Sequence, residues 1–333
     1  MEARDTHREW RRTLMLYALL ALAGLAALRF GGTRPLANEA ARLWQDPGPV
    51  AERDLFHGAT SDERAPQPPF RFLKEDSSGS KPKLHVRDAN GQTWSVKFDR
   101  RSGRGSEVPA EIAASRIAWA LGYFVEESYL VRDGVITDTE RLKRGRSVLD
   151  ERGHFAIARF EPRPKDVERL DIRWTVADNP FTGSRELAGL VMLAALVNDW
   201  DFRAGNTTVL RVPHAGTQYL VSDWGTAFGR MSPHRSRWDL DDYRKDPQFF
   251  AVSGDAVEVN LNPDDSPERA RVSLDHARWF ASLAAQLTLD QLRRAFEAAG
   301  ATAQERDGFA AAVHDRVARL HAAVSDGTGS RAR

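Results

Sequence analysis

Two segments in the second half of the chain carry acidic and amide side chains at spacings suited to magnesium and phosphate chemistry. Asp201 and Asn206 lie five residues apart in one loop, and Asp223 ends an apolar run and precedes Gly225 by two residues. Carboxylate and amide oxygens are ligands that Mg²⁺ accepts, and an aspartate can also take the proton of a hydroxyl group. Asn206 and Asp223 are therefore candidates to bind Mg²⁺, and Asp201 is a candidate to accept or orient an acceptor hydroxyl.

Charged residues in the first half of the chain are candidates for holding phosphates. Lys97 lies in a predicted strand over residues 93–98, where a buried ammonium group requires an anionic partner. Glu111, on a helix predicted over residues 107–121, is the candidate to hold that lysine, and Glu107, one turn earlier, is its rival.

A polar turn between the first two predicted strands is a candidate phosphate cradle. Backbone N–H groups of a Ser/Gly turn bind anions, and a following lysine adds charge. The residues concerned are Ser78, Gly79, Ser80 and Lys83.

Each signal also has a commoner structural interpretation, such as a solvated lysine, a solvated helix face or a turn with Asx caps. Their order favours the chemical interpretation: phosphate turn, strand lysine, helix glutamate, Asp-x-x-x-x-Asn loop, strand, Asp-x-Gly. Each also falls on the type of element that its role requires. Phosphoryl transfer depends mainly on positioning and on neutralising charge, and this order supplies a group for each task.

The predicted elements change from mostly strands to mostly helices along the chain. Strands are predicted over residues 70–73, 83–87, 93–98, 125–131 and 155–160, with Asn90-Gly91 as a two-residue hairpin turn and the helix 107–121 between the third and fourth strands. In the second half, a buried helix is predicted over 185–197, strands over 208–212 and 217–222, and helices over 267–287, 289–299 and 303–324. Thr288 with Gln291 and Thr302 with Glu305 have the spacing of capping boxes.

The N-terminal region contains an apolar run from Thr13 to Leu28, preceded by a basic tail over residues 1–12. Its length and flanking arginines predict a single-pass membrane anchor over residues 13–29, with a cleaved signal sequence as the alternative. Residues 30–69 are predicted to be a linker, with one short helix around residues 37–44. A small excess of basic residues before the span favours an exported domain, and the cytoplasmic side stays open.

Composition excludes several other classes of protein. The 333 residues carry a formal net charge of +1, so nucleic acid is not expected as a partner. The chain has no cysteine, which excludes disulfides, Fe–S clusters and thiolate zinc sites. No HExxH zinc motif and no Gly-x-Ser-x-Gly elbow occur.

From about Phe70 to Phe228 the chain resembles the protein-kinase-like superfamily, in the branch that contains HipA-like kinases and phosphatidylinositol kinases. The turn 78–83 is similar to the phosphate loop of HipA-like proteins, and Glu111, followed by Ile117-Ala118 and Gly122, is similar to their glutamate helix. The segment 154–160 resembles the strand that enters the hinge. Asp201 and Asn206 match the catalytic loop, and Asp223 matches the metal-binding aspartate. Arg203 stands where these families commonly have histidine, and Trp224 where protein kinases have phenylalanine.

This resemblance implies an α+β fold of two lobes, with ATP and Mg²⁺ between them. The N-lobe, residues 70–163, would be a small antiparallel sheet with one helix, and the C-lobe, residues 164–333, would be mainly helical. Lys97 would bind the nucleotide phosphates and be held by Glu111. The implied function is an ATP- and Mg-dependent phosphotransferase acting on a protein, lipid or small-molecule acceptor. A membrane-anchored pseudokinase, acting as an interaction module without catalysis, and a transferase of AMP are the alternatives.

Overall fold

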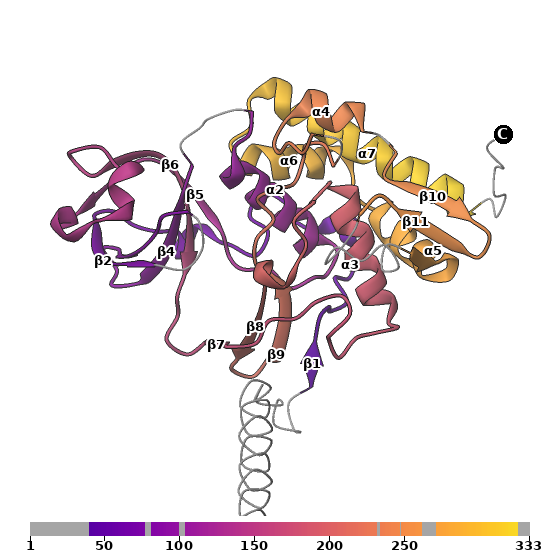
Figure 1. The fold of residues 1–333 in the computed structure, drawn as a ribbon, viewed down its shortest axis with the longest axis horizontal. Helices are drawn as coiled ribbons and strands as arrows, with labels where there is room; N and C mark the ends of the chain where they lie inside the picture. The colour runs from indigo at the N-terminus through magenta and orange to yellow at the C-terminus, as the bar shows by residue number, and fades with distance from the viewer. Residues whose placement is uncertain are drawn as a thin grey trace, which may run out of the picture. The chain divides into compact units, whose positions relative to one another are not determined.

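The computed structural model describes residues 40–76, 81–99, 104–231, 234–246, 248–261 and 271–325. The chain divides into two units, residues 1–40 and 41–333, and the second unit contains all the elements below (Figure 1). The anchor predicted at residues 13–29 and the phosphate turn predicted at residues 78–80 lie outside the described ranges. Within those ranges, no helix combines the length and the apolar character needed to cross a bilayer.

Five strands form a closed barrel in the order β2-β3-β4-β6-β5. They are β2 (Phe70–Asp76), β3 (Lys83–Arg87), β4 (Thr93–Phe98), β5 (Tyr129–Thr137) and β6 (His154–Pro162). All neighbours are antiparallel except β2 and β5, which pair in parallel at Phe70 with Ile136 and at Arg71 with Thr137. The predicted antiparallel sheet is thus present, and the parallel pairing of β2 with β5, which was not predicted, closes it into a barrel without free edges.

The two faces of the barrel differ in chemistry because residues alternate along each strand. In β4, Trp94, Val96 and Phe98 point into the barrel core, and Ser95 and Lys97 point outward. In the ladders, Lys83 of β3 and Arg159 of β6 lie directly opposite Lys97 on either side. The outer face of the barrel therefore carries a row of three cationic side chains.

Helix α2 (Glu107–Ala120) follows the barrel strand β4 and is buried along almost its whole length. The Asp99 side chain accepts hydrogen bonds from the backbone N–H groups of Glu107 and Val108, which caps the helix. Gly122, with φ at +88°, ends it in the left-handed conformation that glycine favours. The helix packs on α6 as well as on the barrel strands β5 and β6, so it shares a hydrophobic core with the second half of the chain.

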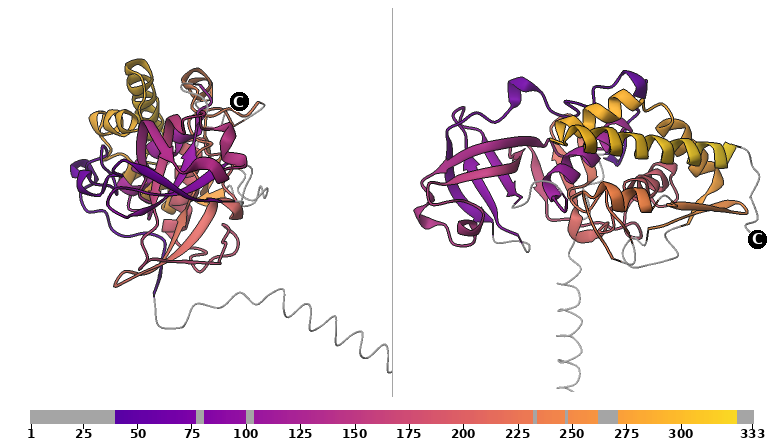
Figure 2. Two further views of the ribbon diagram at one scale, coloured as in Figure 1. Left: turned by 90° about the vertical axis from the view of Figure 1, so that its left-hand side faces the viewer. Right: turned by 90° about the horizontal axis from the view of Figure 1, so that it is seen from above.

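The second half is mainly helical, as predicted, and its helices surround one large apolar core. They are α3 (Arg185–Leu196), α4 (Leu240–Lys245), α5 (Leu274–Ala284), α6 (Leu289–Ala298) and α7 (Ala303–Ser325). Both predicted capping boxes are confirmed: the hydroxyls of Thr288 and Thr302 accept from the N–H groups of Gln291 and Glu305, whose side chains accept in return. In Figures 1 and 2 these helices, pink for α3 and orange to yellow for α4 to α7, lie to one side of the barrel.

Two small sheets also belong to this half. One has the order β10-β11-β12, with β10 (Phe250–Ser253), β11 (Ala256–Val259) and β12 (Arg271–Ser273). The helix predicted from residue 267 is therefore corrected, because residues 271–273 form β12 and α5 begins at Leu274. The other sheet has the order β1-β9-β8-β7, with β1 (Ala41–Arg42), β7 (Glu168–Leu170), β8 (Thr207–Val212) and β9 (Gly216–Val221).

Residues 41–69, which the sequence predicts to be linker, pack against the rest of the unit. Strand β1 pairs in parallel with β9, and Figure 1 shows the two side by side. The short helix predicted around residues 37–44 is therefore wrong over residues 40–44, the part that the structure describes. Leu43, Val50 and Leu55 are buried in the large core. Short 3₁₀ turns occur at Val50–Glu52, Asp62–Arg64, Thr139–Arg141, Arg144–Ser147 and Ala204–Asn206.

Candidate functional site

Lys97 is the centre of a buried charge cluster between the barrel and α2. Its ammonium group lies 3.0 Å from Glu111 Oε2 and 3.0 Å from both carboxylate oxygens of Asp223. Its side chain is only 3% exposed. Burial by itself lowers the pKa of Lys97, but Glu111 and Asp223 outweigh that effect and raise the pKa above its ordinary value. Lys97 is therefore a fully charged lysine that bridges two carboxylates from separate elements.

Glu111 is held from two sides. One carboxylate oxygen accepts from Lys97, and the other pairs with Arg159 of β6, which in turn pairs with Glu161 at 2.7 Å. Glu107 is the more distant carboxylate, because its Oε2 lies 3.6 Å from Lys97 Nζ. The geometry thus gives Glu111 the closer contact and Glu107 a second, longer one.

Asp223 follows the end of β9 and turns back toward the barrel. Its Oδ1 also accepts from the N–H group of Gly225 at 3.0 Å. A Cβ at Gly225 would lie 2.9 Å from Asp223 Oδ1 and 3.3 Å from Lys97 Nζ, so a side chain there would push into the cluster. Burial by itself raises the pKa of Asp223, but Lys97 and Arg159 outweigh it and hold that pKa at about 2. Asp223 is consequently an anion throughout the physiological pH range.

Lys83 adds a second ammonium group beside Lys97. It is partly buried, and within the described ranges it makes no ion pair. Burial, followed by repulsion from Lys97, lowers the pKa of Lys83. A partly buried cation with no carboxylate of its own is a position where an anionic ligand would be favoured.

The Asp201–Asn206 loop lies beside the end of β9. The N–H group of Ser222 donates to the Asn206 carbonyl at 2.8 Å, which ties the loop to the residue just before Asp223. The Asn206 amide donates to Asp201 Oδ2 at 2.9 Å, and Arg203 Nε pairs with Asp201 Oδ1 at 2.8 Å. Asp201 is therefore held from both sides by residues of its own loop.

Asp199 is a buried carboxyl that the sequence did not single out from the loop around it. Its Oδ1 accepts from the Thr226 hydroxyl, and its Oδ2 has no hydrogen-bond partner among the described residues. Burial, with further contributions from Asp223 and Asp201, raises the pKa of Asp199 to about 7. Three acidic side chains are thus near enough to one another to interact, and one of them holds a proton near neutrality.

The structure brings three of the predicted site residues into direct contact: Lys97, Glu111 and Asp223. Lys83 lies beside them in the ladder, and Asp201 and Asn206 form a hydrogen-bonded pair next to the Asp223 segment. Ser78, Gly79 and Ser80 are not described. Sequence reasoning missed Arg159, and the one available signal was its position in a strand otherwise rich in apolar residues.

The described residues contain no group of three or more histidine, aspartate or glutamate side chains that could by itself hold a metal ion. Magnesium is commonly bound by one or two protein ligands together with phosphate and water oxygens. Asp223 and Asn206 can supply that number of ligands, and no larger set is required.

Comparison with known proteins gives likenesses in structure only. No protein-family model matches the chain, and no curated protein sequence matches it. It resembles the proinflammatory kinase CtkA of Helicobacter pylori, at 13% identity and a TM-score of 0.47, over 78% of this chain and 99% of that one. It also resembles a Golgi casein kinase, at 11% identity and a TM-score of 0.42, over 85% of this chain and 83% of that one. A structure of the Golgi casein kinase with Mn and ADP bound gives 12% identity, a TM-score of 0.41, and coverage of 84% and 82%.

Proposed function

We propose that this chain is an ATP- and Mg-dependent phosphotransferase with a protein-kinase-like site. The observation that carries the proposal is the contact of Lys97, on β4, with both Glu111 and Asp223. Glu111 lies on α2, and Asp223 follows β9, 126 residues further along the chain than Lys97. A buried lysine between two carboxylates is costly to maintain unless the charges serve a purpose, because each charge must be removed from water. Binding a polyphosphate and its metal is a purpose that needs both signs of charge together.

The residues present fit a nucleotide with its metal. Lys83 and Lys97 can meet phosphate oxygens, and Lys83 makes no ion pair with another described residue. Asp223, ionised at neutral pH, and the amide oxygen of Asn206 are suitable ligands for Mg²⁺. Bound Mg·ATP supplies the phosphoryl group and neutralises charge as it is transferred.

The acceptor side of the reaction falls to Asp201. Its carboxylate orients the acceptor hydroxyl and takes its proton, and Asn206 and Arg203 hold the carboxylate in place. Arg203 pairs with Asp201 through two of its nitrogens, so this arginine also competes with the acceptor for the carboxylate. The apolar run from Thr13 to Leu28, by its sequence alone, supports a location at a membrane.

The substitution Asp223→Asn tests the proposal, because it keeps the size of the side chain and removes its charge. We expect Mg·ATP-dependent turnover to fall about 100-fold or more, and the stabilisation of the protein by Mg·ATP to be lost. Thermal shifts with Mg·ATP and transfer of labelled γ-phosphate, to the protein itself or to added acceptors, measure the two effects. Asp275→Asn, which changes an exposed aspartate on α5, is the matched control.

Unchanged Mg·ATP binding and turnover in Asp223→Asn would contradict the proposed site. Binding of Mg·ATP by the unaltered chain without any transfer would favour the pseudokinase. Mass analysis of the modified product separates the remaining alternative, because transfer of AMP adds a nucleotide and transfer of phosphate does not.

A further inference from the structure

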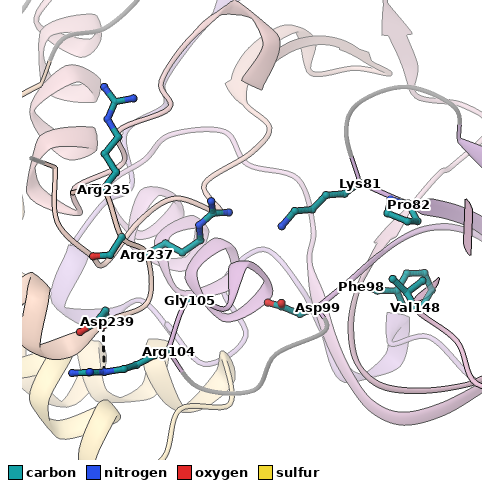
Figure 3. A pocket seen from close by; sticks show the side chains of 11 residues that line it. Lys81, Pro82, Phe98, Asp99, Arg104, Gly105, Val148, Arg235, Arg237 and Asp239 are labelled. Carbon is teal, nitrogen blue, oxygen red and sulfur yellow. Dashed lines mark ion pairs between the residues drawn. The ribbon is translucent and has the colours of Figure 1, made fainter. Parts of the chain in front are cut away.

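A cavity of about 650 Å³ lies next to the Lys97 cluster, between the barrel and the segment after Asp223. Figure 3 shows Lys81 and Arg237 reaching toward each other across it, with Arg235 and Arg104 on the side of Arg237. Phe98 and Val148 lie together on the opposite side, beyond Lys81. The cavity thus combines a cationic side with a small apolar wall.

Two acidic residues, Asp99 and Asp239, also line the cavity. Asp99 caps α2 through the N–H groups of Glu107 and Val108. Asp239 accepts from the N–H group of Asp242 at 3.0 Å, at the start of α4, and also pairs with Arg104. Asp239 thus offsets the charge of Arg104, and Glu107, together with Asp99, offsets the charges of Lys81 and Arg237. Arg235 is the lining cation that makes no ion pair with a described residue.

The cationic side is attached to the catalytic loop through Trp200, the residue before Asp201. The guanidinium groups of Arg235 and Arg237 lie 5.2 Å and 5.4 Å from the centre of the Trp200 ring. The indole N–H of Trp200 donates to the Ser236 carbonyl at 2.9 Å. Arg235 is exposed, and in the part of the chain that the structure describes it makes no ion pair.

Glu107 connects the cavity to the charge cluster on its other side. One of its carboxylate oxygens pairs with Lys81 and Arg237, and the other lies 3.6 Å from Lys97 Nζ. The Glu107 carboxylate therefore lies between a ligand in the cavity and Lys97. Such a ligand would also lie beside the loop that carries Asp201.

We infer that this cavity binds the phosphate group of a small phosphomonoester acceptor, and that Arg235 and Arg237 are its recognition residues. The inference rests on the proposed function, since it names the class of acceptor for that same site. The volume falls within the range of about 300–1,000 Å³ typical of small-molecule sites. Arginine presents paired donors that match phosphate oxygens, and the wall of Phe98 and Val148 suits a carbon skeleton.

The test is isothermal titration of the full chain at low ionic strength with phenyl phosphate, benzoate and benzyl alcohol as probes. We expect phenyl phosphate to bind, and Arg235→Gln to raise its dissociation constant about tenfold, the loss expected for one charge-assisted contact. Arg294→Gln is the matched control. Like Arg235, Arg294 is exposed and lies over an aromatic ring, with its guanidinium group 5.0 Å from the centre of the Phe56 ring, but it belongs to α6 and does not line the cavity. We expect that variant to bind phenyl phosphate as the unaltered chain does.

Three results would overturn the inference: no binding of phenyl phosphate, binding that Arg235→Gln leaves unchanged, or equal binding of benzoate or benzyl alcohol. Mg·ATP thermal shifts on the same samples keep this outcome separate from the fate of the proposed function. If phenyl phosphate binds in a way that depends on Arg235 but the protein does not respond to Mg·ATP, the anion site is supported and the proposed phosphotransferase function is contradicted. If the protein responds to Mg·ATP but does not bind phenyl phosphate, the proposed function is supported and the anion site is contradicted.

Discussion

Asp199 is the carboxyl of the site that has the fewest groups to stabilise a negative charge. Its carboxyl is fully buried, accepts one hydrogen bond from Thr226, and interacts unfavourably with Asp223 and Asp201. Burial raises the pKa of Asp199 to about 7. Burial also acts to raise the pKa of the neighbouring Asp223, but Lys97 and Arg159 outweigh it and hold that pKa at about 2. Two carboxyls of one site therefore differ in pKa because Lys97 and Arg159 lie near Asp223, whereas Asp199 is buried near two other carboxylates.

The substitution Asp199→Asn should increase the stability of the protein relative to the unaltered chain, and the increase should grow as pH rises. In the native state the carboxyl keeps its proton up to pH of about 7, whereas the unfolded chain loses it near pH 4, so native stability falls between these values. Asparagine does not titrate, so the variant should gain about 1.4 kcal/mol per pH unit over this window, up to a limit of about 4 kcal/mol. Urea unfolding of both proteins at several pH values measures the difference. A stability difference that stays constant from pH 4 to 8 would contradict the raised pKa.

Most of the contacting residues at the site could be predicted from sequence, but their energetics could not. Lys97, Glu111 and Asp223 were recognisable because their order and their element types matched the tasks of phosphate and metal binding. Asp199 and Asp201 are separated by one residue and look equivalent in the sequence. Only the structure shows that one is fully buried and the other is partly exposed and paired with Arg203.

At the scale of elements, helix α7 positions the loop that carries Asp201. Its Arg316 is buried and donates to the Leu196 carbonyl and to Asn198 Oδ1, each at 2.9 Å, where α3 ends. Asn198 has a left-handed backbone, with φ at +56°, and donates to the Gly229 carbonyl at 2.8 Å. One arginine thus joins the C-terminal helix to the start of the loop and, through Asn198, to the segment after Asp223.

The substitution Arg316→Ala should destabilise the protein by about 3 kcal/mol or more, because it leaves several buried carbonyl groups without a donor. Urea unfolding measures the loss. Arg319→Ala, at an exposed position on the same helix, should change stability by less than about 0.5 kcal/mol. Equal effects of the two substitutions would show that the buried hydrogen bonds of Arg316 contribute nothing.

Local sequence patterns predicted well the elements that depend on neighbouring residues. They predicted less well the elements that depend on pairing with distant parts of the chain. Strands β3 and β4 have the predicted ends, but their hairpin loop has three residues between Asp88 and Gln92 in place of the predicted two. The Asp88 side chain accepts from the N–H groups of Asn90 and Gln92 and so stabilises the longer loop. Barrel closure and the two-residue strand β1 depend on partners far along the chain, for which the sequence gives no local signal.

At the scale of the whole described unit, residues 41–69 are part of the fold. They contribute three buried apolar side chains to the large core, and the Gln291 amide donates to the carbonyls of Val50 and Arg53 at 2.7 and 2.8 Å. Gly122 leaves no space for a Cβ, which would lie 2.3 Å from the Gln45 carbonyl oxygen. This segment is therefore fitted against α2 and α6 and is not merely a spacer.

A chain that begins at Phe70 should be much less stable than one that begins at Ala40. Loss of Leu43, Val50 and Leu55 from the core removes roughly 5–8 kcal/mol of burial, which is comparable with the total stability of about 5–15 kcal/mol of a typical domain. Circular dichroism and urea unfolding of the two chains measure the effect. Identical unfolding midpoints would show that residues 41–69 act as a simple linker.

The parallel pairing of β1 with β9 has a mechanical consequence. Ala41 and Arg42 pair with Thr217 and Gln218, and β9 ends at Val221, two residues before Asp223. A pulling force that enters the chain ahead of Ala41 would act first on this short ladder, and through it on the strand that leads to Asp223. The ladder therefore joins the start of the folded unit directly to the strand that leads to Asp223.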